Sequence, residues 1–145
     1  MTSQPLPSKK VVRDLMSSAV RTLKRNDELL IADTVMRTER IRHLPILDDD
    51  GRLVGILSQR DLFLSALVRA LGHGSAARDR ALGSIEVKQV MTADVVTTTP
   101  ETPIAAAAQV MVDRKIGCLP VVKDDALVGI LSESDIVSAV ARGDL

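Results

Sequence analysis

The hydrophobic and polar positions of this chain follow one pattern twice. In each half a short β-prone segment precedes a helix with an apolar stripe, then two apolar runs flank a polar turn, and a second helix closes the unit. The stripes consist of Leu29, Ala32 and Met36 in the first half and Ile104, Ala107, Ala108 and Met111 in the second. The pattern predicts an α/β fold made of two β-α-β-β-α repeats.

Sequence signals also place the boundaries of these elements. Asp27 is a good N-cap for the first striped helix, and Thr102 is one for the second, with Pro103 at its first helical position. The β-prone segments are 20–23 and 95–98, and the paired apolar runs are 44–47 with 53–57 and 119–122 with 127–131. Each pair of runs predicts a β-hairpin whose strands are mostly buried.

The two halves align at a nearly constant offset, which indicates a duplication. Met16 matches Met91, and Leu44-Pro45-Ile46 matches Leu119-Pro120-Val121, at 75 residues. Gly-Ile-Leu-Ser-Gln-Arg-Asp, which starts at Gly55, matches Gly-Ile-Leu-Ser-Glu-Ser-Asp from Gly129 at 74. The second half has therefore lost one residue, and we predict that the loss falls in a loop.

The duplication divides the chain into four parts. We expect a flexible arm at 1–10, a first repeat at 11–70, a linker at 71–85 with about one helical turn, and a second repeat at 86–145. The linker is rich in Gly and Ser and contains His73, which we expect to be solvated.

Composition narrows the classes of function. A net charge of zero removes the overall attraction that nonspecific nucleic-acid or acidic-membrane binding needs, although residues 1–72 carry 12 Lys and Arg against 9 Asp and Glu. Phe63 is the only aromatic residue, so no stacking platform for single-stranded nucleic acid exists. A single cysteine, Cys118, and no long apolar run favour a cytosolic, cytoplasmic protein.

A Ser-x-x-Asp box begins each closing helix. The serine oxygen of such a box accepts a bond from the first turn and the acid reaches back to the cap N–H, a structural use that needs no ligand. The same geometry suits a nucleotide, because a helix N-terminus attracts phosphate and a nearby carboxylate binds ribose hydroxyls. Gly55 and Gly129, just before the boxes, allow close approach of backbone or ligand.

This ordered set of motifs, present twice over residues 11–142, resembles the CBS domain, named for cystathionine β-synthase, and in tandem a Bateman module. The resemblance implies two β-α-β-β-α CBS repeats packed with pseudo-twofold symmetry, with clefts between them that bind adenine nucleotides in many members. It also implies a regulatory protein, not an enzyme. No combination of nucleophile, base and orienting group suggests catalysis, and no three side chains suggest a metal site.

The resemblance assigns residues to the nucleotide site. Asp61 and Asp135 would bind ribose, with Ser58 and Ser132 near phosphate. The adenine would contact backbone and apolar atoms around His43, Leu44 and Pro45 and around Cys118, Leu119 and Pro120, and Thr22 and Thr97 would lie on the strand that lines each cleft. A proline inside a strand breaks the ladder, so we expect backbone groups of its neighbours to be free to read an adenine edge. Arg42, His43 and Arg60 lie at the anion end of the first site, where the second has Gly117, Cys118 and Ser134. We therefore expect the phosphate-rich contact in the first half; the alternative for both arginines is a solvated surface.

The sequence thus predicts a ligand-sensing module for AMP, ADP or ATP, with NAD and S-adenosylmethionine as lesser candidates. We expect a homodimer that signals to a protein effector, with no direct nucleic-acid contact and no membrane contact. The alternative is a structural or protein-interaction module whose boxes are only helix caps. His43 and Cys118 share one repeat position, where we expect structural filling in place of metal binding, and the methionines Met16, Met36, Met91 and Met111 are expected in the core.

Overall fold

The computed structural model describes residues 9–70, 79–80 and 82–145, without the side chains of 66–70. Its elements, in order, are α1 (Val12–Leu15), β1 (Leu23–Lys24), α2 (Leu29–Glu39), β2 (His43–Leu47), β3 (Leu53–Ser58), α3 (Gln59–Ala70), the 3-10 helix η1 (Val87–Gln89), α5 (Ile104–Arg114), β4 (Cys118–Lys123), β5 (Ala126–Ser132) and α6 (Glu133–Arg142). The predicted succession of strand, helix, hairpin and helix is confirmed in the first repeat. In the second, a single bridge from Thr98 to Val121 replaces the first strand.

The first strand of each repeat is short because of a proline in its neighbour. Strand β1 pairs in parallel with β2, Leu23 facing Ile46, and Thr98 faces Val121 in the same way. Pro45 and Pro120 have no N–H to donate the next hydrogen bond that would extend this ladder toward the N-terminus. The β-prone segments at 20–23 and 95–98 therefore pair only at their ends.

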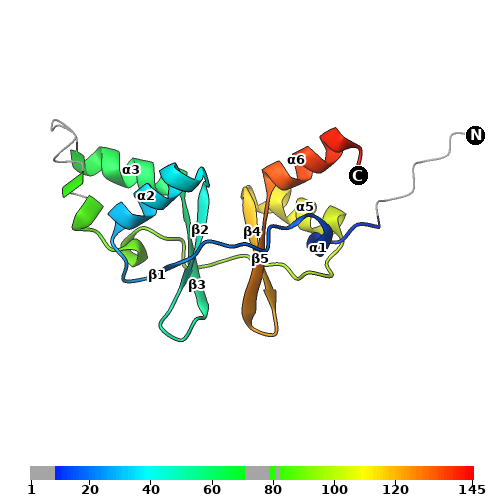
Figure 1. Cartoon of the computed structure of the whole chain (residues 1–145), viewed down its shortest axis with the longest axis horizontal. Helices are drawn as coiled ribbons and strands as arrows, with labels where there is room; N and C mark the ends of the chain where they lie inside the picture. Colours follow the sequence, from blue (N-terminus) through cyan, green and yellow to red (C-terminus); the bar gives the residue numbers. More distant parts are fainter. Residues whose placement is uncertain (1–8, 71–78, 81) are drawn as a thin grey trace, which may run out of the picture. The chain divides into compact units, whose positions relative to one another are not determined.

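The chain forms two compact units that do not follow its linear order. One consists of Arg21–Val95, and the other combines the described residues up to Val20 with Val96–Leu145. We call them the central unit and the terminal unit. In Figure 1, α2 and α3 lie on one side of the β2–β3 hairpin, and α5 and α6 lie on one side of the β4–β5 hairpin.

The N-terminal segment is held in the terminal unit by backbone hydrogen bonds. The N–H of Val12 donates to the carbonyl of Thr102 at 2.9 Å, and Ser17 exchanges two bonds with Ile130, each 2.9 Å. The equivalent segment of the second repeat is bound in the central unit, where Thr92 exchanges two 2.9 Å bonds with Ile56. The opening segment of each repeat thus packs on the hairpin of the other repeat.

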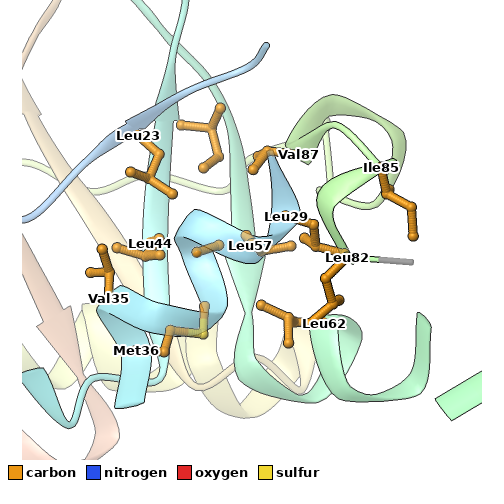
Figure 2. Close-up of a cluster of buried hydrophobic side chains, with 12 residues drawn as sticks. Leu23, Leu29, Val35, Met36, Leu44, Leu57, Leu62, Leu82, Ile85 and Val87 are labelled. Carbon is orange, nitrogen blue, oxygen red and sulfur yellow. The ribbon is translucent and has the colours of Figure 1, made fainter. Parts of the chain in front are cut away.

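The core of the central unit draws on most of its elements (Figure 2). Leu29, Leu44 and Leu57 are fully buried, and they contact a set that includes Leu82 and Ile85. The predicted linker 71–85 therefore ends in core-forming sequence, although the part that holds His73 lies outside the described residues, as does most of the predicted arm 1–10. The terminal unit has its own core, formed by Val12, Ile104, Ala107, Met111, Leu119, Val121 and Leu131.

The helix starts differ by one residue from their prediction. The N-caps of α2 and α5 are Glu28 and Pro103, neither with a side-chain cap bond. The carboxylate of Asp27 accepts the N–H of Lys24 at 2.8 Å and so stabilises the turn before α2. Thr102 pairs instead with the hydroxyl of Thr99 at 2.7 Å. Both side chains bond toward the preceding loop, which removes them from capping.

The missing residue of the second repeat falls in the hairpin turn, as predicted. The β2–β3 connection spans Asp48–Arg52 and contains Gly51 at φ +81°, whereas the β4–β5 connection turns through Asp124 and Asp125 at φ 53° and 64°. Two successive positive φ values are typical of the tight two-residue hairpin turn. The strands on either side keep equivalent pairings.

Candidate functional site

Both closing helices begin with the same backbone arrangement. The N–H of Gln59, the first residue of α3, donates to the carbonyl of Arg42 at 2.7 Å, and that of Glu133 in α6 donates to Gly117 at 2.9 Å. Ser58 lies opposite His43 on the neighbouring strand, and Ser132 lies opposite Cys118. We call the two places the α3 junction and the α6 junction.

The predicted site residues divide cleanly between the two units. The central unit holds Thr22, Arg42, His43, Leu44, Pro45, Ser58, Arg60 and Asp61, and the terminal unit holds Thr97, Cys118, Leu119, Pro120, Ser132 and Asp135. The leucines of both sets are fully buried in the cores. Their side chains therefore fill the cores of the two units.

The Ser-x-x-Asp box of the α6 junction is a complete capping box, as predicted. Ser132 Oγ accepts the N–H of Asp135 at 3.3 Å, while Asp135 Oδ2 accepts the N–H of Ser132 at 2.9 Å. The Ser132 hydroxyl also pairs with that of Ser134 at 2.8 Å. At the α3 junction Ser58 Oγ accepts the N–H of Asp61 at 3.0 Å. Each box therefore fixes its aspartate at the first turn of a helix.

The glycines before the boxes are explained by packing inside each unit. A Cβ on Gly129 would lie 2.6 Å from Met16 Sδ and 3.0 Å from the carbonyl oxygen of Ser17, and a Cβ on Gly55 would collide with Met91. The close approach that the sequence indicated is confirmed. The approaching groups are a methionine side chain of the opening segment at both glycines and, at Gly129, also the backbone carbonyl of Ser17. Met36 and Met111 are buried, and Met16 and Met91 pack against the cores half-buried.

The strand proline of the second repeat both takes part in the sheet and interrupts it. The carbonyl of Pro120 accepts the N–H of Thr98 at 3.0 Å, so it is already engaged in the sheet. The break in the ladder lies one step earlier, where Pro120 has no N–H to offer the carbonyl of Val96.

The two junctions carry opposite charge. Arg42 and Arg60 are exposed at the α3 junction, and neither has an ion-pair partner among the described residues. The α6 junction has Gly117 and Ser134 at these positions and adds a carboxylate, Glu133, where the α3 junction has the neutral Gln59. Burial, with a contribution from the Glu133 carboxylate, raises the pKa of the Cys118 thiol to about 12.

Sequence reasoning missed Glu133 although a signal for it was present. The 74-residue offset aligns Glu133 with Gln59, directly beside the serine of each box. Its proximity to Cys118 became apparent only from the pairing of β4 with β5. Among the described residues no three His, Cys, Asp or Glu side chains gather to hold a metal ion.

None of the described helices is long and apolar enough to cross a membrane.

Comparison with known proteins identifies the family. The model of the CBS domain matches this chain twice, at residues 12–67 and 87–142. The chain belongs to the CBS domain family. A homoserine O-acetyltransferase of Methanococcoides burtonii is 33% identical over 126 residues, which are 86% of this chain and 23% of that protein. The chain thus spans about a quarter of the length of this and similar homoserine O-acetyltransferases.

Solved CBS structures have the same fold. A putative acetoin utilization protein, AcuB, from Vibrio cholerae superposes with a TM-score of 0.75 at 36% identity, covering 91% of this chain and 90% of that one. The CBS domain pair of protein MJ0100, in complex with 5′-methylthioadenosine and S-adenosyl-L-methionine, superposes with a TM-score of 0.77 at 28% identity, covering 94% and 98%. The resemblance to the CBS domain family and the predicted α/β fold are confirmed.

Proposed function

We propose that this CBS protein is a regulatory module that binds an adenosine-containing nucleotide, AMP, ADP or ATP, at its strand-to-helix junctions and signals the occupancy to a partner protein. The observation that carries the proposal is the duplicated junction, in which the hydroxyl of the box serine accepts the backbone N–H of the box aspartate in the first turn of a helix. The adenosine compounds bound by the CBS pair of MJ0100 support this ligand class. We propose no catalytic activity.

The residues have distinct functions in this proposal. Asp61 and Asp135 bind the ribose hydroxyls, and Ser58 with Arg42 and Arg60 binds phosphate at the α3 junction. The two arginines suit this task because their charge is not neutralised by any carboxylate of the described chain. Binding then shifts a conformational or oligomeric equilibrium by the difference in affinity between its states.

The test is thermal unfolding with AMP, ADP, ATP, NAD and S-adenosylmethionine, using wild type, Asp61→Ala and Asp135→Ala. A ligand at about 100 times its Kd should add about 2.7 kcal/mol to the free energy of unfolding. We expect one of the adenine nucleotides to raise the unfolding midpoint, and the Asp61 variant to cancel the rise. A matched control is Asp50→Ala, an exposed acid in the β2–β3 turn. No shift with any compound would refute the proposal.

A second function is favoured by the α6 junction, where Asp135 already bonds the N–H of Ser132. Under this alternative the boxes only cap helices, and the protein is an interaction module without a physiological nucleotide. Both aspartate variants would then lose about 1 kcal/mol of stability. No ligand on the panel would raise the unfolding midpoint of wild type or of either variant.

We further propose a homodimer. Large apolar side chains are exposed on helices of both units, and Phe63 in α3 and Val137 in α6 are equivalent positions of the repeat, 57% and 67% exposed. A second copy that covers such side chains would remove apolar area from water. Analytical ultracentrifugation should give twice the 15.6 kDa of one chain, and a single-chain mass would refute the dimer.

A further inference from the structure

The two junctions share their backbone geometry and differ in charge beside the box. The first residue of each closing helix donates its N–H to the residue before the facing strand, at 2.7 Å for Gln59 and 2.9 Å for Glu133. Both side chains therefore start from the same place relative to the serine. One side chain is a neutral amide and the other is a carboxylate of nearly the same size.

We infer that Glu133 is a specificity-determining residue that makes the α6 junction reject phosphate, so that this junction takes an uncharged or cationic adenosine compound while the α3 junction takes a phosphorylated one. The inference rests on the proposed function and assigns a ligand class to each of its two sites.

The charge of Glu133 is not neutralised within the described chain. It takes part in no ion pair there, and the residues equivalent to the α3 arginines are Gly117 and Ser134. Its carboxylate lies near enough to the buried Cys118 to help raise the pKa of that thiol. The field of Glu133 thus extends to the strand residue opposite the box serine.

A phosphate placed at the α6 junction would meet this carboxylate without a compensating cation. The partial positive charge of a helix N-terminus is only about +0.5, so it offsets Glu133 and leaves little for a phosphate dianion. An uncharged 5′ group avoids the repulsion, and a cationic 5′ group is attracted by the carboxylate. The paired hydroxyls of Ser132 and Ser134 can bond to either.

Isothermal titration with AMP and with adenosine tests the inference on the whole 145-residue chain. Asp61→Ala is used to silence the α3 junction and Asp135→Ala to silence the α6 junction. With only the α6 junction active, adenosine should bind about tenfold more tightly than AMP, and adding Glu133→Gln should reduce that preference about fivefold or more. With only the α3 junction active AMP should be preferred, and adding Gln59→Glu should weaken AMP more than adenosine.

The matched control is Asp125→Asn, which removes one negative charge at the β4–β5 turn, away from the junction. It should leave both affinities of the α6 junction unchanged. Thermal unfolding of the Glu133 variant separates binding from helix stability, because an acid in the first turn also stabilises a helix. If Glu133 only stabilises the helix, Glu133→Gln would change the affinities for AMP and adenosine equally.

Two outcomes would overturn the inference, and they can be told apart. If the α6 junction binds AMP as tightly as adenosine and Glu133→Gln changes neither, Glu133 does not set specificity, while the proposed nucleotide function stands. If wild type binds neither compound nor any other adenosine ligand of the panel, the proposed function itself fails and the inference fails with it.

Discussion

At Gly129 the backbone of β5 meets two groups of the N-terminal segment, and these groups differ in how well they can move. Met16 Sδ is the end of a flexible side chain, whereas the carbonyl oxygen of Ser17 is held by a 2.9 Å bond from the N–H of Ile130. At Gly55 the three atoms nearest to a Cβ all belong to the side chain of Met91. The two repeat-equivalent glycines therefore predict unequal tolerance to substitution.

We expect Gly129→Ala to lower the free energy of unfolding by about 2 kcal/mol, and Gly55→Ala to lower it by about 1 kcal/mol. The nearest contacts of a Cβ include a fixed backbone carbonyl at Gly129, whereas at Gly55 they all belong to one flexible side chain. Urea unfolding measures both. Gly83→Ala is the control, since its Cβ would have Glu28 Oε2 as its nearest neighbour at 3.9 Å. Equal losses at the two glycines would contradict the backbone argument.

Cys118 predicts a dependence of stability on alkaline pH. Burial, aided by Glu133, raises its pKa from 9.0 to about 12 in the folded chain, so the unfolded chain loses this proton first as pH rises. The stabilising contribution is complete below pH 9 and is lost between pH 9 and about 12. Cys118→Ala should show a shallower decline in urea-unfolding free energy over that range. Parallel curves for wild type and variant would exclude the effect.

At the scale of elements, the two hairpins reach the same strand pairing through different turns. The longer β2–β3 turn places Gly51 at φ +81°, and no atom lies within 4 Å of a Cβ built there. The shorter β4–β5 turn places two aspartates at positive φ. The cost of substituting Gly51 is therefore purely a matter of backbone conformation.

We expect Gly51→Ala to lower the free energy of unfolding by about 1 kcal/mol, since an L-residue is strained at positive φ. Asp125→Gly should have the opposite sign and raise stability by about 0.5 kcal/mol, because the two-residue hairpin turn favours glycine at its second position. Thermal unfolding of each variant checks the pair. A stabilising Gly51→Ala would show that the turn relaxes to negative φ.

At the scale of the whole molecule, the exchange of opening segments couples residues that are distant in sequence. Val12 and Val87 are equivalent positions of the repeat and both are fully buried. Val12 belongs to the core that contains Leu119 and Leu131, and Val87 to the core that contains Leu44 and Leu57. Each valine thus stabilises the hairpin of the other repeat.

We expect Val12→Ala and Val87→Ala each to cost about 2 kcal/mol, by loss of buried methyl groups and the cavity left behind. Native-state hydrogen exchange distinguishes them: Val12→Ala should reduce protection in β4 and β5, and Val87→Ala in β2 and β3. If each variant weakened instead the hairpin that follows it directly in sequence, the exchanged packing would be wrong.

The sequence by itself determined the order of elements, the position of the missing residue and the capping box at Ser132 and Asp135. These features depend on interactions within a few residues, such as helical periodicity, turn chemistry and the reach from a cap to the first turn. The repeat made each signal more specific because it had to occur twice. The same reasoning placed the caps at Asp27 and Thr102 one residue early, since it could not see that their side chains bond to the preceding loop.

Only the tertiary structure decided which segments pack together. That Val12 belongs to the core of the second repeat and Leu82 to that of the first follows from contacts between residues far apart in the chain, which leave no local pattern. The same is true of Met16 against Gly129 and of Glu133 beside Cys118. The hydrophobicity of a residue predicts that it will be buried. It does not predict which residue it will contact, because the hydrophobic effect is non-directional.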